Sequence, residues 1–306
     1  MQSYQKEYEY YLTGELALSL NTVKSYLHDI EKYCGFLTKY RGKNHPEDIE
    51  TQDVRAYLAS LKRRHIASSS QARNLTAIKS FHKFLLLEKY VTKNVTKAVD
   101  APKQEKKLPI ILSIAEVERI LASLKKDNPL QIRNKAVIEV LYSSGMRVSE
   151  LISLRLSDLR LQIGFLQVYG KGRKERIIPI GEPAIEALKF YLRESRPVLL
   201  KNKQTDFLFL NTRGTSITRE SIWKIIKDAA KDAGINKNIT PHTLRHSFAS
   251  HMLEQGLDLR LIQELLGHED ISTTEIYTHI RNVKLKETYL HAHPRARKKG
   301  RLYEKI

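Results

Sequence analysis

The segment TPHTLRHSFASH, residues 240–251, predicts the helix from which the fold of this chain can be worked out. Thr240 is a favourable N-cap residue and Pro241 suits the first helical position, so a helix should begin here. His242 and Arg245 stand three residues apart, which places both side chains on one face of that helix. An arginine in such a place suits a phosphate, because its planar fork donates to two oxygens and stays charged.

Three further blocks carry polar residues in patterns of the same kind. The blocks are SGMRVSEL at 144–151, YGKGRKER at 169–176 and LLGHEDISTTEIYTH at 265–279. They add four candidate catalytic side chains, Arg147, Lys171, His268 and Tyr277. Lys171 lies at the tip of a predicted β-hairpin, between two short β-prone runs. Phosphodiester cleavage needs fixed cations for the charge that grows on the non-bridging oxygens, a nucleophile, and a proton donor for the departing sugar oxygen.

The chain of 306 residues is strongly basic, with a formal net charge of +19 at pH 7. Such an excess points to a polyanionic partner, either nucleic acid or an anionic membrane surface. No run approaches the ~18 apolar residues of a spanning helix, and no signal-peptide pattern is present. We therefore expect a cytoplasmic, nucleoid-associated protein without membrane insertion. The single cysteine, Cys34, excludes a disulfide framework and is expected in the core.

Apolar periodicity divides the chain into two domains and a linker. Residues 1–100 show the spacing of amphipathic helices, and the polar stretch 101–109 between the domains contains two prolines. Residues 110–306 are predicted to be mostly helical with a small antiparallel β-sheet. The expected fold class is therefore mainly α, arranged as a two-domain clamp. Exposed basic residues of the N-terminal helices are candidate DNA contacts, namely Arg63, Arg64, Arg73, Lys79 and Lys83.

These blocks, in this order, resemble the tyrosine recombinases and, within that group, the Xer recombinases, nearest the D-type. The resemblance covers essentially the whole chain and includes HPRA at 293–296. HPRA, and the lack of an extra N-terminal arm-binding domain, favour an Xer recombinase over a phage integrase. The resemblance implies the DNA breaking-rejoining fold, with an N-terminal core-binding domain and a C-terminal catalytic domain.

The resemblance also implies which residues hold the scissile phosphate. Arg147 and Arg245 would clamp it, and His268 would donate a hydrogen bond to a non-bridging oxygen. His242 would assist proton transfer as well as hold the phosphate. Glu150, three residues after Arg147 on the same helix, would orient that arginine rather than touch DNA.

The remaining two residues would carry out the bond exchange. Tyr277 would attack the phosphate and form a 3′-phosphotyrosine link, while Lys171 would donate the proton to the departing 5′ oxygen. The phosphotyrosine stores the bond energy, and cationic side chains take the electrostatic role, so no metal or cofactor is expected. His242 and His246 have zinc-like spacing, but the H-E-x-x-H glutamate is missing, which argues against a metal site.

The partners implied are double-stranded DNA with a specific recombination site and further recombinase protomers. The active assembly would be a homo- or hetero-tetramer, with a second Xer recombinase and a DNA translocase as possible partners. A helix within 282–306 would pack on a neighbouring protomer, and the basic tail 297–306 has no assigned role. The expected duty is resolution of chromosome or plasmid multimers at a dif-like site. A mobile-element integrase, a topoisomerase IB-like enzyme acting alone and a non-catalytic DNA-binding protein stay as alternatives.

Overall fold

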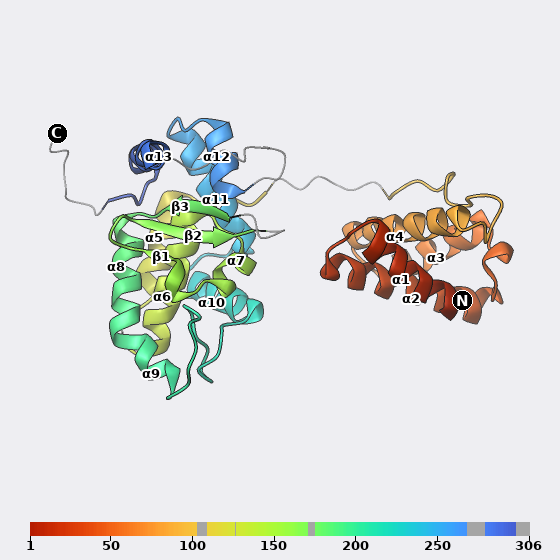
Figure 1. The fold of residues 1–306 in the computed structure, drawn as a ribbon, viewed down its shortest axis with the longest axis horizontal. Helices are drawn as coiled ribbons and strands as arrows, with labels where there is room; N and C mark the ends of the chain where they lie inside the picture. The colour runs from red at the N-terminus through yellow and green to blue at the C-terminus, as the bar shows by residue number, and fades with distance from the viewer. Residues whose placement is uncertain (103–108, 126, 171–174, 268–278, 298–306) are drawn as a thin grey trace. The chain divides into compact units, whose positions relative to one another are not determined.

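The computed structural model of this chain describes residues 1–306 apart from 103–108, 126, 171–174, 268–278 and 298–306. The chain divides into two compact units, residues 1–107 and residues 108–306 (Figure 1). None of the helices in the described ranges has the length and apolar character needed to span a bilayer.

All of the regular secondary structure in the described part of the N-terminal unit is helical. Its elements are α1 (Gln2–Tyr10), the π-helical η1 (Tyr11–Glu15), α2 (Leu20–Arg41), the 3-10 helix η2 (Pro46–Asp48), α3 (Thr51–Arg63) and α4 (Ser68–Leu87). Helix α2 begins where the Ser19 hydroxyl accepts a hydrogen bond from the Thr22 N–H. Aromatic rings fill the core between the helices, among them Tyr8, Tyr33, Phe81 and Phe84. Cys34 is buried in this core, and burial raises the pKa of its thiol to about 11, as suits a packing residue.

The second unit is a set of helices around a small sheet. Its first half contains α5 (Ile114–Ser123), α6 (Pro129–Ser144), α7 (Val148–Ser153), η3 (Leu156–Asp158), β1 (Leu159–Arg160), β2 (Phe165–Tyr169) and β3 (Glu175–Pro179). Its second half contains α8 (Glu182–Phe190), η5 (Tyr191–Ser195), α9 (Arg196–Leu200), α10 (Arg219–Asp232), α11 (Pro241–Glu254), α12 (Leu259–Leu266) and α13 (His279–Ala292). The predicted fold class, mainly helical with a small antiparallel sheet, is confirmed.

The sheet has the antiparallel order β1-β2-β3, and Tyr169 pairs with Glu175 at the end of the predicted hairpin. Strand β1 was not predicted, because two residues are too few to show an alternating pattern. Helix α6 lies at the centre of the unit and is buried on most of its surface. Helices α8 and α11 pack against α6, so the segments that carry the candidate site share one core.

Helix α13 contributes to the core of its own unit. Leu285 and Tyr289 are buried, and the Tyr289 hydroxyl donates to the Ser143 carbonyl oxygen on α6 (2.9 Å). Leu290, on the helix that was expected to pack on a neighbouring protomer, packs against the same core. These three side chains of α13 are therefore occupied within the single chain.

Candidate active site

A glycine turn between α6 and α7 positions Arg147. Gly145 ends α6 in the left-handed region with φ 58°, and a Cβ atom there would lie 2.4 Å from the Phe248 ring. Both the backbone conformation and the close approach of α11 therefore require glycine. Arg147 follows as the N-cap residue of α7, and its side chain is partly exposed.

Glu150 holds Arg147 at two points. Its carboxylate accepts the Arg147 backbone N–H at 2.7 Å and the Arg147 Nη1 group at 3.3 Å. Burial by itself would raise the pKa of Glu150, but the hydrogen bonds and charges of Arg176 and Arg147 outweigh it and lower the pKa. The carboxylate is therefore ionised and fixed beside Arg147. This contact is the one expected from the sequence for these two residues.

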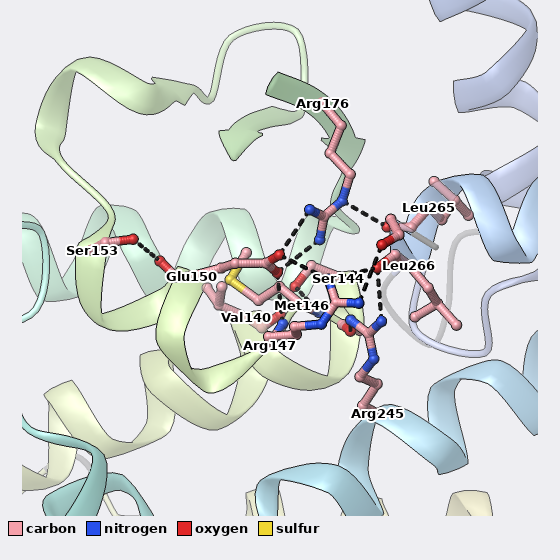
Figure 2. A network of polar contacts seen from close by, with 12 residues as sticks. Val140, Ser144, Met146, Arg147, Glu150, Ser153, Arg176, Arg245, Leu265 and Leu266 are labelled. Carbon is pink, nitrogen blue, oxygen red and sulfur yellow. Dashed lines mark hydrogen bonds and ion pairs between the residues drawn. The ribbon is translucent and has the colours of Figure 1, made fainter. Parts of the chain in front are cut away.

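Arg245 reaches the same place from the middle of α11. Its Nη1 group donates to the Gly145 carbonyl oxygen at 2.8 Å, and its Nη2 group donates to the Leu266 carbonyl oxygen at 2.7 Å. Arg147 donates to the next carbonyl oxygen, that of Gly267, at 3.2 Å. The two predicted clamp arginines thus meet at the C-terminal end of α12, as Figure 2 shows for their side chains and Leu266.

The electrostatic environment of Arg245 is suited to an anion. Burial, and then the nearby Arg147 charge, lower the pKa of Arg245 to about 10, so the group still carries its proton at pH 7. Within the described ranges, no carboxylate forms an ion pair with Arg245. The two carbonyl oxygens that Arg245 contacts carry only partial negative charge. A phosphate would therefore neutralise the Arg245 guanidinium more completely.

His242 lies one turn before Arg245 on α11, and its side chain is exposed. Partial desolvation and the charge of Arg245 lower the pKa of His242, so the imidazole is neutral at pH 7. A neutral imidazole can both accept and donate a proton. His251, on the same helix, is instead buried and shares a hydrogen bond with the Tyr142 hydroxyl at 2.7 Å, which makes it a core residue.

Three of the six predicted catalytic residues, Lys171, His268 and Tyr277, lie outside the described residues. The structure therefore brings together Arg147, Arg245 and His242, with Glu150 in support. Among the residues described, no group of three or more His, Cys, Asp or Glu side chains has the arrangement of a metal site.

One residue at the site was missed by sequence reasoning. Arg176, the second residue of β3, is buried and makes a bidentate ion pair with Glu150, at 2.9 and 2.7 Å. Its Nε group also donates to the Leu265 carbonyl oxygen at 3.1 Å. The available signal was an arginine at an inward-facing position of an alternating strand, where a buried charge needs a partner.

The candidate DNA contacts of the N-terminal unit are all on exposed positions of α3, its C-cap and α4. Arg63 and Arg64 lie at the end of α3, beside the exposed ring of Tyr40. Arg73 on α4 forms an ion pair with the buried Asp29 at 2.5 Å, which neutralises part of its charge. Lys79 and Lys83 are one turn apart on the exposed face of α4.

Comparison with known proteins covers both units. Residues 111–283 match the model of the phage integrase family, and residues 6–89 match that of the phage integrase N-terminal SAM-like domain. Tyrosine recombinase XerD of Halalkalibacterium halodurans is 47% identical over 282 residues, which is 92% of this chain and 94% of the relative. Tyrosine recombinase XerD of Listeria monocytogenes serotype 4b is 43% identical over 292 residues, which is 95% of this chain and 98% of the relative.

Solved structures agree with the sequence comparison. The XerH site-specific recombinase bound to palindromic difH substrate has a TM-score of 0.68 at 25% identity, covering 89% of this chain and 80% of that chain. A lambda integrase dimer bound to a COC′ core site has a TM-score of 0.66 at 20% identity, covering 92% of this chain and 99% of that chain, and it supports the fold alone. The resemblance to Xer-type tyrosine recombinases is thus confirmed. The chain belongs to the phage integrase family, as a tyrosine recombinase and a homologue of XerD.

Proposed function

We propose that this chain is a site-specific DNA recombinase that resolves chromosome or plasmid multimers at a dif-like site. The observation that carries the proposal is the meeting of Arg147 and Arg245 at the Leu266 carbonyl oxygen, next to the neutral His242. Arg245 pairs with no carboxylate among the described residues, and the Glu150 carboxylate beside Arg147 is shared with Arg176, so the two guanidinium groups suit a phosphate that gains charge during attack.

In the proposed reaction, Arg147 and Arg245 exchange their carbonyl partners for the non-bridging oxygens of the scissile phosphate. Tyr277 attacks in line, and its hydroxyl proton passes to the neutral His242 imidazole as the 3′-phosphotyrosine bond forms and the bond to the 5′ oxygen breaks. Lys171 supplies a proton to the departing 5′ oxygen, which becomes a free hydroxyl. A tyrosine hydroxyl has a pKa near ~10, so the surrounding cations are needed to make it reactive at neutral pH. His268 and His242 complete the contacts to the phosphate.

We further propose that the chain acts within a tetramer on DNA. Solved relatives support this proposal: XerH binds a palindromic difH substrate, and lambda integrase forms a tetramer bound to a Holliday junction. A second Xer recombinase and a DNA translocase are the proposed partners, and the DNA substrate places the protein at the nucleoid. Integration of a mobile element uses the same chemistry at a different DNA site.

The covalent intermediate gives the sharpest test. A suicide duplex, nicked close to the cleavage site, loses a short fragment after attack and leaves the protein attached to DNA. The sites to try are synthetic dif-like duplexes and fragments selected from genomic DNA by binding to this protein. We expect a covalent adduct with the parent chain, none with Tyr277→Phe, and DNA affinity within about twofold for both, because only the phenolic oxygen is removed.

The matched control is Tyr10→Phe, which removes the hydroxyl of an exposed tyrosine on α1, outside the proposed site. It should form adduct like the parent. If the parent binds DNA tightly and forms no adduct, the chain is a DNA-binding protein built on this fold. Adduct formation without strand exchange between two sites would favour the topoisomerase IB-like alternative.

A further inference from the structure

Arg176 joins three segments that are distant in the sequence. It begins on β3, reaches Glu150 on α7 with both terminal nitrogens, and donates from Nε to the Leu265 carbonyl oxygen on α12. The side chains of Arg176 and Glu150 are only 8% and 4% exposed. Charge-assisted hydrogen bonds in such a buried place are short and well fixed, so the three segments are held together at one guanidinium group (Figure 2).

Glu150 is shared between Arg176 and Arg147. The same two carboxylate oxygens that bind Arg176 accept the backbone N–H and the Nη1 group of Arg147. A carboxylate without Arg176 would keep only the partly exposed Arg147 as its cation. The position of Arg147 therefore depends on Arg176, although the two arginines make no hydrogen bond with each other.

Arginine side chains also fix the C-terminal end of α12. Its last carbonyl oxygens lack helical partners, and those of Leu265, Leu266 and Gly267 accept from Arg176, Arg245 and Arg147 respectively. Gly267 has φ 67°, and a Cβ atom on it would lie 2.9 Å from Arg176 Nη1. Arg176 thus lies directly against the residue that precedes His268 in the chain.

We propose that Arg176 is a positioning residue for strand cleavage: through Glu150 it orients Arg147, and through Leu265 it fixes the end of α12. The inference rests on the proposed function, because it assigns Arg176 to the same phosphate clamp. Arg176 itself does not touch the phosphate. Its removal should slow cleavage while leaving DNA binding, which uses surfaces of both units, almost unchanged.

The test compares Arg176→Met with the parent in single-turnover cleavage of the suicide duplex at saturating protein. We expect cleavage to be slower by about 100-fold, the size of effect seen when reacting groups are misplaced by about 1 Å. Affinity for the same duplex, measured by fluorescence anisotropy, should change by less than about threefold. Arg176→Lys keeps the positive charge but not the planar fork of donors. Its cleavage rate should therefore be less than about tenfold higher than that of Arg176→Met.

A double-mutant cycle with Arg147→Lys separates positioning from a general loss of stability. If Arg176 acts through Arg147, the two reductions in rate should overlap, so the double variant is at least tenfold faster than the product of the two reductions predicts. Hydrogen exchange gives a readout without DNA, because the Arg147 amide donates to Glu150 and should exchange faster in Arg176→Met.

Two further variants control for folding. Arg176→Met leaves a buried carboxylate without its main cation, so Arg176→Met combined with Glu150→Gln removes the charge as well and should fold while staying slow. Arg133→Met removes another buried arginine, one that donates to the Leu210 carbonyl oxygen away from the clamp, and should cleave like the parent.

The inference is overturned if the folded Arg176 variants cleave within threefold of the parent, if the two reductions in rate simply multiply, or if DNA affinity falls as much as the rate. Failure of the parent to form an adduct would instead overturn the proposed function. The hydrogen-exchange measurement does not depend on cleavage. Even if the parent forms no adduct, unchanged exchange at the Arg147 amide in Arg176→Met would overturn the positioning role.

Discussion

Single ionisable residues in this protein are tuned by burial in both units. In the catalytic unit, Arg245 stays charged while its pKa is lowered to about 10, and His242 is kept neutral beside it. In the N-terminal unit, His82 is buried on α4, its ring shares a hydrogen bond with the Tyr33 hydroxyl at 3.0 Å, and burial lowers its pKa to about 4. Arg245 and His242 are proposed to bind the phosphate, whereas the buried His82 is expected to make the stability of the protein sensitive to acid.

Burial of His82 should make the stability of the protein depend on pH. A histidine in the unfolded chain has a pKa near ~6.5, so the unfolded chain binds a proton at this position below that pH. Folded His82 has a pKa of about 4 and stays neutral until the pH approaches that value. Its contribution is therefore present above about pH 6.5 and falls away as the pH decreases towards 4. Between pH 7 and pH 5 the decrease in the free energy of unfolding amounts to about 2 kcal/mol.

The measurement is urea unfolding of the full chain at pH 7 and pH 5. His82→Gln keeps a polar partner for Tyr33 but does not titrate, so its free energy of unfolding should fall by about 2 kcal/mol less than that of the parent over this interval. His28→Gln, at an exposed position of α2, is the matched control and should behave like the parent. An equal pH response in parent and His82→Gln would contradict the assignment.

Among the elements, the segment that follows α13, residues 293–296, holds this helix against the rest of its unit. His293 is buried and stacks on Tyr289 with ring centroids 5.0 Å apart. Glu182 at the start of α8 donates its N–H to the Ala296 carbonyl oxygen at 2.9 Å. The HPRA motif is a family signature in the sequence, and in the structure it fastens the end of α13 to α6 and α8.

The ion pair between Arg295 and Glu139 gives the prediction at this scale. Glu139 lies on α6 with 4% of its side chain exposed, and Arg295 contacts both carboxylate oxygens, at 2.5 and 3.2 Å. Arg295→Met would leave the buried carboxylate without its ion-pair partner and with only the weaker influence of the Lys135 charge, which should destabilise the catalytic unit by about 3 kcal/mol. Urea unfolding of the full chain checks this value.

The combination of Arg295→Met with Glu139→Gln should recover most of that stability, because no charge is then left unpaired. Arg193→Met is the matched control, since Arg193 pairs with Glu194 on the exposed surface and should contribute less than about 1 kcal/mol. A double variant as unstable as Arg295→Met would show that packing of the arginine stem, rather than the charge, is responsible.

Across the whole molecule, positive charge is unevenly distributed. Residues 51–100 carry 10 basic and 3 acidic side chains, whereas residues 1–50 carry 6 basic and 8 acidic ones. The exposed basic side chains of α3 and α4 are thus the part of the N-terminal unit that suits a phosphate backbone. In the proposed function, this positive charge contributes to DNA affinity, whereas Arg147 and Arg245 are assigned to the reaction.

Salt dependence tests this division. We expect DNA affinity to fall about 10³-fold or more between 50 and 200 mM salt, as for proteins that bind about six or more phosphates. Lys79→Gln with Lys83→Gln should reduce the slope of log affinity against log salt by about 2, because each lysine neutralises one phosphate. Lys24→Gln, on an exposed position of α2 beside Glu31, should leave the slope unchanged. A slope near zero for the parent would exclude a mode of DNA binding that neutralises many phosphates.

Much of the fold follows from local patterns in the sequence. Thr240 caps α11 and Pro241 occupies its first turn, as predicted, and Gly145 ends α6 in a left-handed conformation. The hairpin strands also lie where the β-prone runs placed them. Caps, turns and strand alternation depend on residues within a few positions of each other, so the sequence alone displays them.

The sequence by itself therefore determined the family, the order of the elements, and the residue types offered to a phosphate. Only the tertiary structure decided how these residues are held. Arg176 meets Glu150 across 26 residues and Leu265 across 89, and Arg295 meets Glu139 across 156. Such contacts depend on how helices and strands pack, and no local spacing encodes which buried charge will face which.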